Sequence, residues 1–122
     1  MSNDSIEQLR QQLAEFAAQR DWEQFHSPKN LAMALIGEAA EIIEHFQWLT
    51  PEQSQHLSPE KCKAVSYELA DVFIYLIRMA DKLNVDLISA AQEKMRINEQ
   101  RYPADKVRGD ARRANEYEMN TK

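Results

Sequence analysis

Four carboxylates in this sequence stand in two pairs with the same spacing. Glu38 and Glu41 are three residues apart, and so are Glu68 and Asp71. Residues three apart share one face of an α-helix, about 5–6 Å from each other. If two helices that carry such pairs pack antiparallel, the four carboxylates converge and repel one another unless a cation lies between them. The spacing therefore predicts a metal site.

Carboxylate oxygens suit Mg²⁺, Mn²⁺ or Ca²⁺, and we expect Mg²⁺, with Mn²⁺ as the alternative. No histidine or cysteine stands at the step that a softer metal would need, and His45 and His56 have no partner at catalytic spacing. Acidic pairs are also common on solvated helix faces, which is the alternative interpretation of each pair taken alone. Their repetition beside aliphatic residues favours the metal site, whereas Glu44 by itself fits the solvated surface.

The segments that must position these carboxylates are predicted to be helices. The chain has only two glycines and no hairpin turn signal, so we expect no sheet. Apolar residues at three- and four-residue steps, with Ser-Pro helix starts, predict helices over about residues 5–20, 28–49, 59–83 and 86–101. Leu69 and Leu76 fall in the apolar stripe of the third helix, and residues 51–58 read as a polar connection. The expected fold is all-α and four-helix bundle-like, with one domain over residues 1–103 and a flexible charged tail over residues 104–122.

The composition and net charge limit which kinds of partner this chain can bind. The chain has 122 residues, of which 43% are hydrophobic and 29% charged, a balance typical of one globular domain. A net charge of −5 argues against a nucleic acid polymer as the main partner, because backbone binding needs concentrated Lys and Arg. Cys62 is the only cysteine, and no apolar run is long enough for a membrane span. We expect a cytoplasmic protein with no membrane partner.

The two acidic motifs also carry a resemblance. Glu38-Ala-Ala-Glu41, 26 intervening residues and Glu68-Leu-Ala-Asp71 resemble the signature of the MazG-like all-α nucleoside triphosphate pyrophosphohydrolase superfamily. The stretches FAAQRDWEQFHSPKNLAMALIGEAAEIIEHFQW, ELADVFIYLI and KMRINEQRYP are similar to its dCTP pyrophosphatase branch. The likeness covers about residues 14–103, and an ordered set of motifs over most of a chain is far more specific than one acidic pair.

The resemblance implies Mg²⁺-dependent hydrolysis of a nucleoside triphosphate to the monophosphate and pyrophosphate, most simply dCTP or a modified pyrimidine deoxynucleotide. Glu38, Glu41, Glu68 and Asp71 stand at the family's catalytic and metal-ligand positions. One of them, with Glu38 as our choice, or else Glu44, is expected to orient or deprotonate the attacking water.

The resemblance also implies where substrate binds. Lys94, Asn98 and Tyr102 recur at steps of four, with Arg101 beside them, and these residues together with Lys29 are expected to contact phosphate. The base is expected to meet aromatic residues, in a pocket drawn from Trp22, Trp48, Phe16, Phe25, His26 and Tyr75. Each aromatic alone is more often a core residue.

Three alternatives stay open. The animal enzymes of the branch carry a histidine where Leu13 stands here, which keeps a broad-specificity nucleoside triphosphate pyrophosphohydrolase in play. Hydrolysis of phosphoribosyl-ATP is a further option, against which Trp22 and Trp48 argue. A non-catalytic helical module that senses nucleotide is the rival from another class. The family also implies a homo-oligomer, a dimer or a tetramer, with sites near subunit contacts.

Overall fold

The computed structural model describes residues 3–112, with side chains from Ser5 onward. Over this range the chain is all-helical and has no strand, as expected. Its elements are α1 (Asn3–Gln19), the 3₁₀ turn η1 (Glu23–Phe25), α2 (Pro28–Phe46), α3 (Pro51–Ser54), α4 (Pro59–Lys82), α5 (Leu87–Arg101) and α6 (Ala104–Val107). The chain divides into two compact units, Met1–Val85 and Asp86–Lys122.

The long helices of the first unit begin at the Ser-Pro signals. The Ser27 hydroxyl accepts the backbone N–H of Asn30 at 3.1 Å, and the Ser58 hydroxyl accepts that of Lys61 at 3.1 Å. In each case proline follows the cap, where its missing N–H costs no helical hydrogen bond. Both helix starts are therefore confirmed.

The connection after α2 differs from the expectation. Residues 51–58 were expected to be an irregular polar connection, yet Pro51–Ser54 forms α3. The Thr50 hydroxyl accepts the Gln53 N–H at 3.1 Å, and the Gln53 side-chain oxygen accepts the Thr50 N–H at 2.9 Å. This reciprocal capping box starts a short helix with Pro51 at its first position, whereas α2 has already ended at Phe46, before the expected end near residue 49.

Two helices of the first unit end in a left-handed residue that is not glycine. Asp21 has a φ of 55° and Asn84 a φ of 56°. After α1 the Trp22 N–H donates to the Ala17 carbonyl at 2.9 Å, and after α4 the Val85 N–H donates to the Ala80 carbonyl at 2.9 Å. These are the hydrogen bonds of the Schellman motif, which satisfies carbonyls at a helix C-terminus. The motif after α1 turns the chain into η1.

Asn84 offers a test of this helix end. Replacement of Asn84 by Ala should lower the free energy of unfolding by about 1 kcal/mol, because a Cβ without a polar end is strained in the left-handed region. Asn84→Gly should leave stability equal or slightly higher, because glycine enters that region freely. Urea denaturation of the three proteins measures the difference. Equal stability of the Ala and Gly variants would contradict a left-handed residue here.

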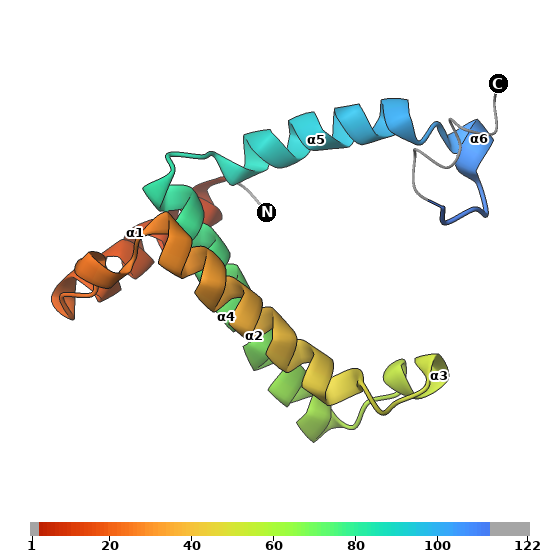
Figure 1. The fold of residues 1–122 in the computed structure, drawn as a ribbon, viewed down its shortest axis with the longest axis horizontal. Helices are drawn as coiled ribbons and strands as arrows, with labels where there is room; N and C mark the ends of the chain where they lie inside the picture. The colour runs from red at the N-terminus through yellow and green to blue at the C-terminus, as the bar shows by residue number, and fades with distance from the viewer. Residues whose placement is uncertain (1–2, 113–122) are drawn as a thin grey trace. The chain divides into compact units, whose positions relative to one another are not determined.

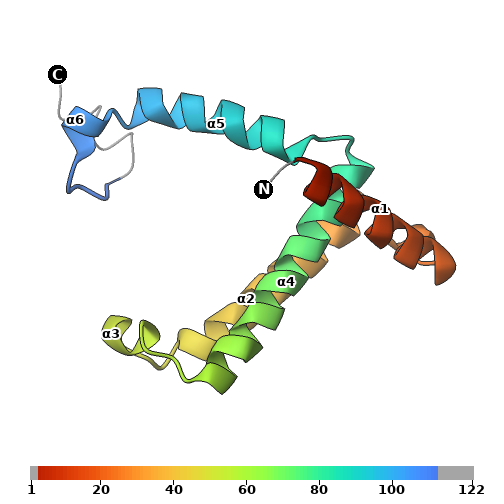
Figure 2. The same cartoon turned by 180° about the vertical axis from the view of Figure 1, so that it is seen from behind.

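α2 and α4 form the frame of the first unit. They lie side by side and run antiparallel, and α1 packs against α4 (Figures 1 and 2). Leu31 of α2 and Ile77 of α4 are the largest side chains that are fully buried, and Ala17 of α1 is buried with them. The antiparallel arrangement is the one that the two acidic pairs require in order to converge.

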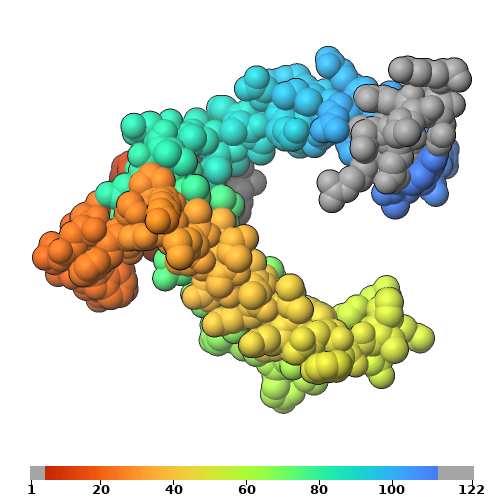
Figure 3. Space-filling model, in the orientation of Figure 1, coloured from red at the N-terminus to blue at the C-terminus, as the bar shows by residue number. Residues whose placement is uncertain are grey.

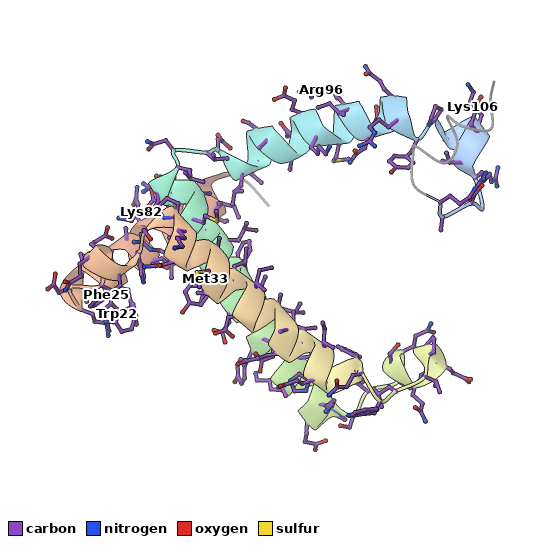
Figure 4. The ribbon with its side chains drawn as sticks, in the orientation of Figure 1. Trp22, Phe25, Met33, Lys82, Arg96 and Lys106 are labelled. Carbon is purple, nitrogen blue, oxygen red and sulfur yellow. The ribbon has the colours of Figure 1, made fainter. Side chains whose placement is uncertain are left out.

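Two apolar faces of the first unit remain open. Met33, Ile36 and Ile43 form the open face of α2; the helix lies exposed to the viewer along its length in Figure 3, and Met33 is labelled on it in Figure 4. Leu69, Phe73 and Leu76 form the open face of α4. Leu69 and Leu76 lie in the apolar stripe that the sequence gives this helix, yet they are 54% and 38% exposed. They are exposed because α4 is apolar on more sides than α1 and α2 cover.

The second unit begins with α5. The Asp86 carboxylate caps this helix by accepting the Ser89 N–H at 3.1 Å, and Arg101 ends it. The tail predicted over residues 104–122 starts with the helical turn α6, so its first residues are not irregular. Residues 113–122 lie outside the described range, and the domain boundary at residue 103 and the flexibility of the tail stay predictions. No helix in the described part of the chain combines the length and apolar character needed to cross a membrane.

Candidate functional site

Three of the predicted carboxylates meet between the two framework helices. α2 supplies Glu38 and Glu41, which stand one turn apart, and α4 supplies Glu68 from the facing helix. One carboxylate oxygen from each lies within 4.8 Å of the other two. Glu38 and Glu68 are half-buried and Glu41 is exposed, so the cluster opens to solvent on one side.

The cluster holds more negative charge than its surroundings can stabilise. Burial raises the pKa of Glu38, and the negative charges of Glu41 and Asp71 raise it further. The pKa of Glu41 is raised chiefly because a protonated Glu41 can share its proton with Glu68, and also because the charge of Glu68 opposes ionisation. In the metal-free protein Glu38 and Glu41 therefore hold protons more tightly than ordinary glutamates.

One oxygen of the cluster points to a cation. Glu68 Oε2 is fully buried, and no hydrogen-bond donor reaches it among the described residues. A buried carboxylate oxygen without a donor is costly, and a hard divalent cation satisfies it by coordination. The gathered donors are all carboxylate oxygens, which fits Mg²⁺, Mn²⁺ or Ca²⁺. The residues present thus suit a divalent metal.

Asp71 and Glu44 lie at the edge of the cluster. Asp71 is exposed and is not one of the three gathered ligands, but its charge acts on Glu38. Glu44 is one turn beyond Glu41 on α2, and its charge contributes to the raised pKa of Glu41. Asp71 as a fourth ligand and Glu44 as a water-binding residue stay predictions.

His45 is a neighbour of the cluster that the sequence interpretation missed. Its Nε2 lies 3.7 Å from Glu68 Oε1, which is close but longer than a hydrogen bond. The available signal was its position four residues after Glu41, on the same face of α2. His45 is not among the gathered ligand atoms, so the donor set of the cluster remains oxygen.

The predicted base-binding aromatics gather in part around η1. The Trp22 ring meets Phe16 edge to face, with centroids 5.8 Å apart, and its centroid is 6.2 Å from that of His26. Trp22 and Phe25 are 42% and 57% exposed, and Figure 4 labels both at the η1 turn. Exposed aromatics held beside one another form a surface on which a flat ring can stack.

Trp48 stands apart from this group. Trp22 precedes α2 and Trp48 follows it, and a helix of 19 residues is about 28 Å long. The two tryptophans therefore cannot stack on one base within a single copy of the chain. Trp48 is 87% exposed, so within this unit it has little packing role.

The remaining predicted residues divide between the units. Tyr75 is half-buried on the face of α4 that carries Glu68, seven residues further along, and Lys29 is exposed in the first turn of α2. Lys94, Asn98, Arg101 and Tyr102 belong to the second unit, where the Arg101 guanidinium lies 5.8 Å from the Tyr102 ring centroid. Their contact with phosphate stays a prediction.

Comparison with known proteins agrees with this geometry. The protein dCTP pyrophosphatase 1 from Homo sapiens is 47% identical over 114 residues, which cover 92% of this chain and 67% of that protein. The Bos taurus protein of the same name is 46% identical over 112 residues, covering 90% and 66%. The chain thus spans about two thirds of the length of these relatives.

The fold has a solved counterpart. The crystal structure of a pyrophosphatase from Archaeoglobus fulgidus DSM 4304 superimposes with a TM-score of 0.77 at 37% identity, covering 81% of this chain and 93% of that one. The sequence also matches the MazG-like family over residues 35–116, a span that contains both acidic pairs. The chain therefore belongs to the MazG-like family.

Proposed function

We propose that this chain is a nucleoside triphosphate pyrophosphohydrolase that converts dCTP, or a modified pyrimidine deoxynucleoside triphosphate, to the monophosphate and pyrophosphate. The observation that carries the proposal is the cluster of Glu38, Glu41 and Glu68, with one buried oxygen that lacks a donor. The dCTP pyrophosphatase relatives support the substrate class, because the likeness runs over most of this chain. Such an enzyme removes unwanted nucleotides from the pool.

The chemistry asks for positioning and charge neutralisation. Glu38, Glu41 and Glu68, with Asp71 as a fourth ligand, hold Mg²⁺ in our proposal, with Mn²⁺ as the alternative. When bound, the ion neutralises phosphate charge and acidifies a coordinated water. Glu38 is proposed to orient the attacking water, because it is half-buried, whereas Glu41 is exposed.

The rest of the substrate meets the proposed binding residues. The nucleoside stacks against the η1 aromatics, with Trp22 and His26 foremost, while Tyr75 lines the α4 side. The residues proposed to bind the phosphates are Lys29, Lys94, Asn98, Arg101 and Tyr102. Because these groups are cationic or donate hydrogen bonds, they suit the triphosphate and its pyrophosphate product.

We also propose that the chain works as a homo-oligomer, a dimer or a tetramer. The open faces of α2 and α4 are apolar and extended, and such faces on a small unit favour burial against a second copy. The cytoplasmic location expected from the sequence stays a prediction.

Ile36 is the residue at which the oligomer is best tested. It is 68% exposed at the centre of the open face of α2. Ile36→Glu should convert the oligomer to monomer, because an ionised side chain at an apolar contact is costly to bury. Light scattering after size-exclusion chromatography measures the mass, and Glu15→Gln on the exposed side of α1 is the control. An unchanged mass for Ile36→Glu would place the subunit contact elsewhere.

The substrate class is tested with a panel of the four ribonucleoside and four deoxyribonucleoside triphosphates, 5-substituted dCTP analogues and phosphoribosyl-ATP. The proposal expects Mg²⁺-dependent release of pyrophosphate, fastest for dCTP or a modified relative. Similar rates for all triphosphates would favour the broad-specificity alternative, which the leucine at position 13 keeps open. Nucleotide binding by calorimetry without any product would favour the non-catalytic sensing module.

A further inference from the structure

A buried arginine links the η1 turn to α4. Arg78 is 3% exposed, and its guanidinium donates to Glu23 Oε1 at 2.7 Å and to His26 Nδ1 at 3.3 Å. It also donates to Asp81 Oδ2 at 3.3 Å, one turn along its own helix. Lys82 makes a second ion pair, with the other oxygen of Glu23. We call Glu23, His26, Arg78, Asp81 and Lys82 the η1 tether.

Side-chain hydrogen bonds hold the η1 turn against the helices beside it. Trp22 and Phe25 keep 42% and 57% of their surface exposed, so their apolar burial is incomplete. The Asn30 side chain donates to the Phe25 carbonyl at 3.0 Å, which fixes the far end of the turn to α2. Among the described residues, Glu23 and His26 are joined to α4 by the hydrogen bonds of Arg78 and Lys82 in the tether. A buried guanidinium persists only where several acceptors compensate it, so the tether specifies one position for η1.

The tether shares a face of α4 with the catalytic cluster. Glu68, Asp71, Tyr75, Arg78 and Lys82 follow one another at alternating steps of three and four residues. Residues at such steps form one stripe along a helix, and ten residues of helix place Arg78 about 15 Å from Glu68. One rigid element therefore carries the carboxylates and the anchor of the aromatic turn.

The protonation of His26 is consistent with this geometry. Its Nδ1 accepts a hydrogen bond from Arg78, which a neutral imidazole can do and an imidazolium cannot. Burial lowers the pKa of His26, and the positive charge of Arg78 lowers it further. The ring therefore stays neutral and in place beside Trp22 at neutral pH.

We propose that Arg78 is a positioning residue, which holds Trp22 and His26 of the η1 turn at a fixed distance from the carboxylate cluster and thereby sets the affinity for the nucleoside part of the substrate. The proposal rests on the function proposed above. Arg78 acts through Glu23 and His26 and touches neither the metal ligands nor, in our account, the substrate.

The test separates binding from chemistry. Arg78→Met keeps an unbranched side chain but removes every donor of the tether; it should raise KM for dCTP about tenfold and change kcat less than about twofold. Arg78→Lys should restore part of the loss, because an ammonium can satisfy Glu23 but cannot also reach His26 and Asp81 in the same fork. Arg96→Met, on the exposed side of α5, is the matched control and should change neither constant.

A second readout does not need turnover. In a Trp48→Phe background, Trp22 is the remaining tryptophan, so its fluorescence reports the η1 turn alone. Arg78→Met should increase quenching of Trp22 by acrylamide and lower its fluorescence anisotropy, and Glu23→Gln should do the same to a smaller extent. If Arg78→Met fails to fold, Glu23→Gln serves as the test variant. Glu23 is 41% exposed, so replacing its carboxylate should leave the protein folded.

The outcomes are distinct. Unchanged KM and unchanged Trp22 quenching in a folded Arg78→Met protein would overturn the proposal, and so would a loss confined to kcat. If the unaltered protein hydrolyses no nucleotide, the proposed function fails and the substrate part of this inference fails with it. The Trp22 quenching would then still decide whether Arg78 holds the η1 turn.

Discussion

Glu41→Gln is expected to lower Mg²⁺-dependent hydrolysis of dCTP by about 100-fold or more while leaving the helical fold intact. Even residues that only support metal ligands cost about 10–100-fold when they are changed, and a lost ligand costs more. The fold should survive because Glu41 is exposed and lies beside two other carboxylates, so the substitution relieves repulsion rather than removing packing. Steady-state rates measure the loss of hydrolysis, and circular dichroism measures the retained helical fold.

The control for Glu41→Gln is Glu15→Gln, which removes the same charge from an exposed position on α1. It should keep full activity. Glu68→Gln should behave like Glu41→Gln, because its carboxylate comes from the facing helix into the same cluster. Activity of Glu41→Gln and Glu68→Gln close to that of the unaltered protein would remove the carboxylate cluster from the mechanism.

The second large effect concerns stability as a function of pH and metal. In the metal-free protein the pKa values of Glu38 and Glu41 lie above their ordinary value of 4.5. A carboxyl whose pKa is raised by folding stabilises the protein below its ordinary pKa, and that contribution is lost as pH rises through the raised value. Above about pH 4.5 these two groups therefore destabilise the metal-free protein progressively.

Thermal unfolding in EDTA, from about pH 4 to about pH 8, measures this destabilisation as the difference in Tm between Glu41→Gln and the unaltered protein. The comparison is needed because Glu23 acts in the opposite direction. Its pKa is lowered, chiefly by the Lys82 hydrogen bond, so its contribution is lost as pH falls. The Tm of Glu41→Gln relative to the unaltered protein should rise with pH in EDTA.

With saturating Mg²⁺ near neutral pH, the unaltered protein should instead have a higher Tm than Glu41→Gln. The ion binds the ionised carboxylates of the folded protein only, so it stabilises the unaltered protein and stabilises Glu41→Gln much less. The Mg²⁺-dependent rise in Tm should also grow with pH, since protons compete with the metal for the same oxygens. A Tm difference that is independent of pH in EDTA, together with no response to Mg²⁺, would contradict a metal site here.

The sequence predicted the features that depend on neighbours along the chain. Ser27 and Ser58 start helices where the Ser-Pro signal placed them, because the cap and its partner are three residues apart. Glu38 and Glu41 share a helix face for the same reason. The sequence also predicted that Glu68 lies near them, on the assumption that two adjacent helices pack antiparallel.

The features that escaped prediction depend on distant contacts. In the sequence Arg78 is one polar residue in the apolar stretch VFIYLIRMA, and its partners Glu23 and His26 lie 55 and 52 residues away. The contact of His45 with Glu68 likewise crosses between α2 and α4. We expected Trp22 and Trp48 to share one base pocket because they flank the second helix in the sequence, but the length of α2 separates them in space. Only the folded arrangement decides such cases.

The central claim is tested most directly by the products formed from dCTP and Mg²⁺ in ¹⁸O-labelled water, followed by ³¹P NMR and mass spectrometry. We expect dCMP and pyrophosphate in equal amounts, with one labelled oxygen per turnover in one of the two products, and we expect neither product when EDTA replaces Mg²⁺. Formation of dCDP and orthophosphate, or intact dCTP after prolonged incubation with a folded protein, would contradict it.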